Sequence, residues 1–201
     1  MGCDIHCYME YKPKGSDSWR GFGGRVNPGR NYWMFGTMAG VRADHLPHVE
    51  PRGVPADMAS DASGDYWIFI TEEGGEGYTT PERAASWCNG SWDRSVLKHP
   101  EKPLLNNFVS GPDAHTHSWL TPDEFELALA VYLKESGFNI GQLRLTAPEA
   151  QAEVQALATE AADHDKTYAL SSITEYWAIL QSLRCFEAQG HEARLVFWFD
   201  N

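Results

Sequence analysis

Polar and apolar residues alternate along residues 3–11, which predicts a β-strand. Its odd positions carry Cys3, Ile5, Cys7 and Met9, and its even positions carry Asp4, His6, Tyr8 and Glu10. Because successive side chains of a strand point to opposite faces, we expect the odd face to pack in the core. The even face is expected to look into a cleft. Residues 17–26 are predicted to return as a weaker antiparallel strand, since they hold three glycines.

The other end of the chain predicts a second strong strand. Residues 192–199 are rich in β-forming side chains, and the run from Leu195 to Phe199 is apolar throughout, which indicates a central strand. A helix is predicted from Thr121 to about Ser136, because the sequence Thr-Pro-Asp-Glu at its start fits an N-cap and a capping box. Its buried stripe is expected at Phe125, Leu129 and Tyr132 or Leu133. Further helices are predicted over residues 31–41, 55–61, 80–88, 147–163 and 171–188.

Residues 42–120 hold most of the prolines and glycines, so a long irregular insertion is expected there. In the helix over residues 31–41, Tyr32, Phe35 and Met38 or Ala39 are expected to face inward. Together these elements predict an α+β fold. A small mixed or antiparallel sheet would include the N- and C-terminal strands, with about three helices packed on it. A chain of 201 residues that is 42% hydrophobic is long enough for a single domain over residues 1–201.

The charge balance narrows the classes of partner. A formal net charge of −12 disfavours a protein that coats duplex nucleic acid, but leaves room for a small phosphorylated molecule or nucleotide. No apolar run reaches the ~18 residues of a membrane span. The four cysteines form no C-x-x-C pair and no signal peptide is recognisable, so reduced thiols and a cytoplasmic location are expected. The oligomeric state stays open.

Two D-x-H triplets carry the clearest chemistry. Asp4 and His6 stand in the first strand, and Asp113, His115 and His117 stand just before the capped helix. Carboxylate and imidazole are the side chains that hold Zn²⁺, Mn²⁺ or Fe²⁺ with positions left open for water. We expect all five to bind divalent metal if the fold brings the triplets together. The alternatives are a polar strand face that meets solvent and a loop whose histidines cap local turns.

Three further groups are expected near this metal. Asp200 follows the apolar run and is predicted to project into the same cleft as Asp4, so that Asp4, His6 and Asp200 are the candidate catalytic residues. Asp200 or Glu10 would support the imidazole of His6. Arg30, Tyr32 and Arg42 flank the helix over residues 31–41 and are predicted to bind the substrate, because arginine pairs bidentately with phosphate. For these two arginines the alternative is ordinary surface charge.

Several short segments resemble a family of uncharacterised phage and bacterial proteins that begin Met-Gly-Cys-Asp-Ile-His. The matching segments are residues 1–6, 30–32, 38–42, 51–55, 117–121 and 196–201. This resemblance implies a phage-related, cytoplasmic protein and carries no activity with it. The first D-x-H is also similar to the opening metal motif of calcineurin-like metallophosphoesterases. Residues 113–118 are similar to the first motif of polymerase-and-histidinol-phosphatase phosphoesterases.

These observations favour a metal-dependent hydrolase of a phosphate ester such as a small nucleotide. A metal-bound water would attack phosphorus, and an unliganded histidine or Glu10 would protonate the leaving group. The competing hypothesis is a protein that binds or sequesters a nucleotide without turnover and so counters host defence.

Overall fold

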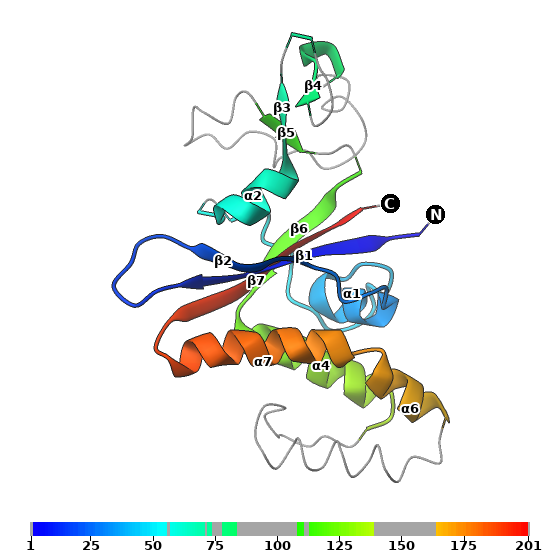
Figure 1. Ribbon diagram of the computed structural model, residues 1–201. Coiled ribbons are helices and arrows are strands. Elements are labelled where there is room, and N and C mark those ends of the chain that lie inside the picture. The colour runs from blue at the N-terminus through cyan, green and yellow to red at the C-terminus, as the bar shows by residue number, and fades with distance from the viewer. Residues whose placement is uncertain are drawn as a thin grey trace.

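A four-stranded antiparallel sheet in the order β2-β1-β7-β6 forms the centre of the protein (Figure 1). The computed structural model describes residues 2–55, 57–70, 72–73, 78–83, 108–110, 113–138 and 164–200. The strands are β1 (Asp4–Lys12), β2 (Arg20–Val26), β6 (His115–Leu120) and β7 (Glu192–Asp200). The predicted α+β fold is confirmed: both terminal strands belong to this sheet, and β7 is an inner strand.

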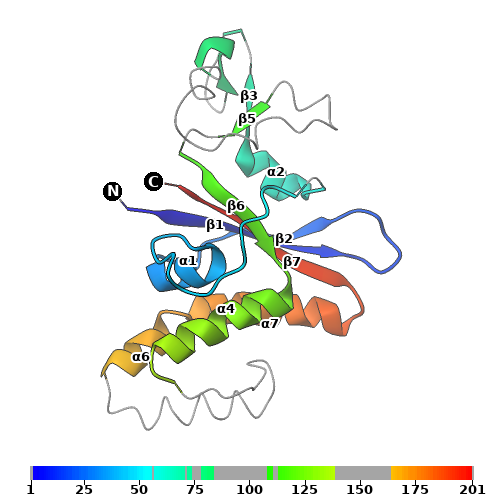
Figure 2. The same cartoon turned by 180° about the vertical axis from the view of Figure 1, so that it is seen from behind.

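One face of the sheet carries the hydrophobic core. Helices α1 (Tyr32–Ala39), α4 (Pro122–Glu135) and α7 (Thr174–Ala188) lie on this side (Figures 1 and 2). The odd positions of β1 pack there as predicted, together with the alternate β7 residues Leu195, Phe197 and Phe199. The capping box of α4 is present, and its predicted stripe of Phe125, Leu129, Tyr132 and Leu133 is buried.

The opposite face is covered along only part of its length. Helix α2 (Ser60–Tyr66) packs over it, and Ala62 joins Tyr8 and Trp198 in a small second cluster. As a result Tyr8 and Glu10 are buried, whereas Asp4 and His6 are only partly buried. The prediction that the whole even face of β1 looks into a cleft was therefore wrong for its second half.

The described part of residues 42–120 contains more secondary structure than predicted. It holds α2, a small sheet in the order β4-β3-β5, and strand β6. The bounds of the small sheet are β3 (Trp67–Ile70), β4 (Tyr78–Thr79) and β5 (Phe108–Ser110). Such short strands give too few positions for a period-2 pattern, which is why the sequence read as irregular. The helix predicted at 55–61 starts later, at Ser60.

The helix predicted over residues 171–188 is interrupted. Helix α6 (His164–Ser171) ends at Ser171, and α7 begins only at Thr174. Hydroxyls there bond to backbone carbonyls, from Ser172 to Ala169 and from Thr174 to Ser171, and such bonds compete with a continuous helix. The helix predicted at 147–163 and most of that at 80–88 lie outside the described residues. Among the described helices, none is long and apolar enough to cross a membrane.

Candidate functional site

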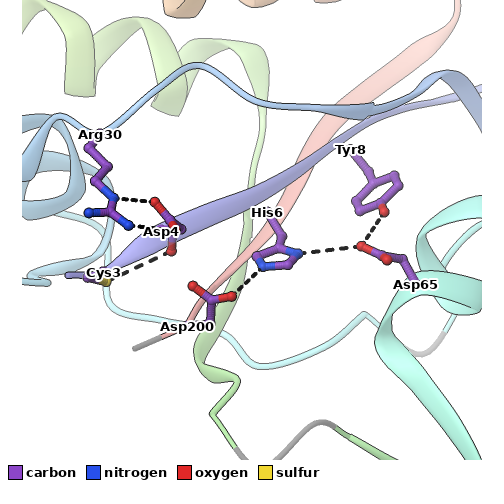
Figure 3. A network of polar contacts seen from close by, with 7 residues as sticks. All are labelled: Cys3, Asp4, His6, Tyr8, Arg30, Asp65 and Asp200. Carbon is purple, nitrogen blue, oxygen red and sulfur yellow. Dashed lines mark hydrogen bonds and ion pairs between the residues drawn. The ribbon is translucent and has the colours of Figure 1, made fainter. Parts of the chain in front are cut away.

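The register of β1 against β7 gathers three of the predicted site residues. Asp4 lies opposite Asp200, and His6 lies opposite Trp198. Residues that face each other across an antiparallel pair share one face, with Cβ atoms about 5 Å apart. Asp4, His6 and Asp200 therefore project together from the face opposite the helical layer (Figure 3). The two ends of the chain lie side by side here (Figure 1).

His6 stands at the centre of this group. Its Nε2 lies 2.8 Å from Oδ2 of Asp200, and its Nδ1 lies 3.4 Å from Oδ2 of Asp65 (Figure 3). The imidazole also stacks on the indole of Trp198, with 5.3 Å between ring centroids. The ring is thus held at both nitrogens and across one face, while 15% of the side chain remains exposed.

Asp65 is a site residue that the sequence did not indicate. It lies in α2, 59 residues from His6, and accepts a hydrogen bond of 2.5 Å from the hydroxyl of Tyr8. Burial and the neighbouring Asp65 carboxylate raise the pKa of Tyr8, so the hydroxyl keeps its proton and remains a donor. Tyr8 therefore fixes the carboxylate that faces His6. No short motif connects Asp65 to the first strand, and only the packing of α2 brings them together.

Arg30 binds Asp4 with two hydrogen bonds. Its Nη2 donates to Oδ2 at 2.8 Å, and its Nε donates to Oδ1 (Figure 3). The Arg30 guanidinium holds the pKa of Asp4 below its usual value, so Asp4 is a carboxylate. Both side chains are about half exposed, at 55% for Arg30 and 46% for Asp4, so a ligand can reach this pair.

Tyr32 and Arg42 border the same end of β1. The Tyr32 hydroxyl accepts a hydrogen bond from the backbone N–H of Cys3 at 3.3 Å, and the guanidinium of Arg42 lies 5.8 Å from the Tyr32 ring centroid. Burial raises the pKa of the Cys3 thiol, against a hydrogen bond from Arg42 that lowers it. The ring of Tyr32 is 40% exposed, so the prediction that it faces inward was wrong. Arg30, Tyr32 and Arg42 thus form one cationic and aromatic border beside Asp4.

The two histidines of the D-x-H-x-H segment, His115 and His117, lie in strand β6 rather than in a loop. His115 pairs with Phe199 and Ser118 pairs with Phe197, so β6 has one extra residue between them. This bulge includes Thr116 at φ 49°, a left-handed conformation that is strained for a β-branched residue.

The bulge separates the two imidazoles of β6. His115 stacks on Phe199 and His117 stacks on Trp198, with ring centroids 6.0 and 6.4 Å apart respectively. Phe199 and Trp198 are successive residues of β7 and point to opposite faces. His115 and His117 therefore lie on opposite faces of the sheet, although residues two apart in a regular strand share one face.

The two triplets do not merge into one site in the described residues. Strand β7 lies between β1 and β6, so their backbones are about 10 Å apart, twice the usual strand spacing. Asp113 is exposed ahead of β6. Within the described ranges, no group of three or more His, Cys, Asp or Glu side chains is arranged to hold a metal ion.

Glu10, an alternative support for His6, has a different place. Its carboxylate is fully buried, accepts from Arg194 at 2.7 Å and accepts from the backbone N–H of Ala59 at 2.7 Å. Burial raises the pKa of Glu10 in spite of these donors. The residue forms an internal ion pair and cannot serve a ligand at His6, so of the two predicted supports only Asp200 contacts the imidazole.

No protein-family model, curated protein or solved structure matches this chain. The resemblance to phage and bacterial proteins therefore stays a prediction, and the candidate function rests on the site itself.

Proposed function

We propose that this protein hydrolyses phosphate esters with the help of a divalent cation bound by Asp4, His6 and Asp200. The observation that carries the proposal is the setting of the His6 ring. Its Nε2 faces Asp200, and its Nδ1 faces the carboxylate that Tyr8 fixes. Metal-ligating histidines commonly present one nitrogen to the ion and donate their other N–H to a carboxylate, which is the position of Asp65.

The donor set fits Zn²⁺, Mn²⁺ or Fe²⁺, which accept mixed imidazole and carboxylate ligands. Each carboxylate oxygen has two lone pairs, so Asp4 can accept from Arg30 and still ligate a cation. In the described conformation these three side chains are not arranged around an ion. Asp200 would therefore have to turn from Nε2 of His6 to make room. The cation would supply a bound water with a lowered pKa.

The remaining groups bind the substrate and move the proton. Arg30 and Arg42 would bind phosphate oxygens by charge-assisted hydrogen bonds. In hydrolysis the oxygen of water bonds to phosphorus and the P–O bond to the leaving group breaks. With one oxygen bound to the cation, Asp200, which is 37% exposed, is proposed to accept the proton of the attacking water at its other oxygen and to return it to the departing ester oxygen. Asp65 and Tyr8 orient the imidazole throughout.

The test combines metal analysis with turnover of bis(p-nitrophenyl) phosphate. The purified wild-type protein is expected to bind Mn²⁺ or Zn²⁺ and to hydrolyse the ester, and Asp200→Asn and His6→Ala are expected to abolish turnover. Asp44→Asn, which changes an exposed carboxylate in the loop after α1, is the matched control and should retain it. Turnover that is equal with and without chelator, or unchanged in Asp200→Asn, would overturn the proposal.

Nucleotide binding without turnover is the second candidate. It is favoured by the fact that Arg30 already engages both oxygens of Asp4, while both nitrogens of His6 face carboxylates. A binding protein would release an intact nucleotide after heat denaturation and show no Mn²⁺-dependent hydrolysis.

A further inference from the structure

Two large aromatic side chains stand exposed at the start of α1, close in sequence to Arg30 of the proposed phosphate site. Tyr32 is 40% exposed and Trp33 is 48% exposed, and both belong to the first turn of α1, which Asn31 separates from Arg30. Fully burying a large apolar side chain is worth about 1.5–3 kcal/mol, so two neighbouring exposed rings leave a substantial stabilisation unused. Exposed apolar patches rimmed by polar groups mark binding surfaces.

The start of α1 holds these rings in a defined position. Asn31 caps the helix by accepting from the backbone N–H of Met34 at 3.0 Å, and its amide donates to Ser172 at 3.1 Å. The Tyr32 hydroxyl is tied to Cys3, and the Trp33 ring packs edge-on against His45 with centroids 6.3 Å apart. A ring that is already fixed loses little conformational entropy when a ligand stacks on it.

The two rings do not face each other. Successive residues of an α-helix point about 100° apart, so Tyr32 and Trp33 point in nearly perpendicular directions and do not enclose a ligand between two parallel rings. The Arg42 guanidinium lies over the Tyr32 ring, while Trp33 is the more exposed of the two. A flat ligand can therefore stack on Trp33 and place its edge toward Tyr32.

We propose that the phosphate ester recognised here is a nucleotide, whose base stacks on Trp33 while Arg30 and Arg42 bind its phosphate. This inference rests on the proposed function for the phosphate site and adds the chemical class of the substrate. Nucleotides are common biological molecules that carry both a flat aromatic ring and a phosphate. Base–aromatic stacking contributes about 1–3 kcal/mol per base.

The experiment compares adenosine 5′-monophosphate with ribose 5-phosphate by titration calorimetry. Both carry the same sugar phosphate, and only one carries a base. Wild type is expected to bind the nucleotide roughly 5- to 150-fold more tightly, which is the effect of one base stack. Trp33→Leu should remove this preference without weakening ribose 5-phosphate binding.

A further variant keeps the result specific. Phe22 is exposed to the same degree as Trp33, at 47%, but lies in β2 opposite Met9, away from Asp4, so Phe22→Leu should leave the preference intact. Equal affinity for the two ligands in wild type, or an unchanged preference in Trp33→Leu, would overturn the inference.

Failure of the inference can be told apart from failure of the proposed function. Hydrolysis of ribose 5-phosphate without any preference for the nucleotide would leave the phosphoesterase standing and remove the base site. Base-dependent binding without turnover would keep the base site and remove the phosphoesterase.

Discussion

Strands β1 and β7 carry facing charged residues at both ends of the sheet face opposite the helical layer, but the charges are opposite at one end and alike at the other. At one end Glu10 lies opposite Arg194 in the register of β1 and β7, and both are almost fully buried. At the other end Asp4 lies opposite Asp200, and both are more than a third exposed. Like charges directly opposite each other destabilise a sheet, whereas opposite charges stabilise it. The pair of Glu10 and Arg194 therefore stabilises the sheet. The facing carboxylates of Asp4 and Asp200 repel each other unless a positive charge binds between or beside them.

At the closed end, defined by Glu10 and Arg194, the charged side chains are paired within the protein. Arg194 pairs with Glu10 and Asp57, and its guanidinium stacks on Trp19 at 3.8 Å from the ring centroid. A cavity of about 750 Å³ opens beside it, between Trp19 and Trp119. The indole rings that line this cavity already stack on the protein's own cations. The candidate chemistry lies instead at the open end, defined by Asp4, His6, Asp65 and Asp200, where Arg30 is the cation that offsets Asp4.

The largest expected effect separates the two ends by stability. Glu10→Ala leaves the buried charge of Arg194 without its main partner, which should lower the free energy of unfolding by about 3–5 kcal/mol. Asp200→Asn removes one of two facing carboxylates and should change it by no more than about 1 kcal/mol. Urea denaturation measures both. A larger loss in Asp200→Asn than in Glu10→Ala would reverse our assignment of the two ends.

The next effect concerns cation affinity. Asp65→Asn keeps the acceptor oxygen and the size of the side chain but removes the charge that faces His6. It should weaken Mn²⁺ binding by about 10- to 100-fold, which is the usual effect of changing a residue that hydrogen-bonds to a metal ligand. The free energy of unfolding should change little. Calorimetric titration with Mn²⁺ gives the affinity, and Asp44→Asn is again the control. Equal affinity in Asp65→Asn and wild type would show that Asp65 does not support the ligand.

A smaller effect should appear in acid near the closed end. Burial works to raise the pKa of Glu124, but hydrogen bonds from Arg52 and Thr121 hold it below its ordinary value of 4.5. Because the folded-state pKa is depressed, this stabilisation is fully present above about pH 4.5 and is lost as the pH falls through the folded-state pKa. Glu124→Gln should cost about 1 kcal/mol at pH 7 and less at pH 3, as seen in urea denaturation at both values. An equal cost at both pH values would contradict this assignment.

The smallest effect tests the strain at the bulge of β6. Thr116 adopts φ 49°, which glycine adopts without penalty and a non-glycine residue adopts at a cost of about 1–2 kcal/mol. Thr116→Gly should therefore be more stable than Thr116→Ala by about 1 kcal/mol in thermal unfolding. If Thr116→Ala proves the more stable variant, the bulge is not strained.

Local signals in the sequence predicted much of the fold. The alternation of β1, the apolar run of β7 and the capping box of α4 each act within a few residues, and each was confirmed. The same alternation could not tell Asp4 from Glu10, because their difference lies in what faces them across β7 and in the cover that α2 provides.

The parts of the candidate site that were missed depend on distant or backbone geometry. Asp65 reaches His6 only through the packing of α2, which lies far along the chain. The left-handed backbone of Thr116 turns His115 and His117 apart, and a threonine gives no sequence sign of such a conformation. Residue spacing therefore predicted the site of β1 better than that of β6.

The central claim, that the open end holds a divalent cation, is tested most directly by the melting temperature with and without Mn²⁺. A cation that binds only the folded state stabilises it by about 2.7 kcal/mol at 100 times its dissociation constant. We predict a clear rise in melting temperature for wild type and Asp44→Asn, and no rise for Asp200→Asn or His6→Ala. A wild-type melting temperature that Mn²⁺ and Zn²⁺ leave unchanged, or a rise of the same size in Asp200→Asn, would contradict the claim.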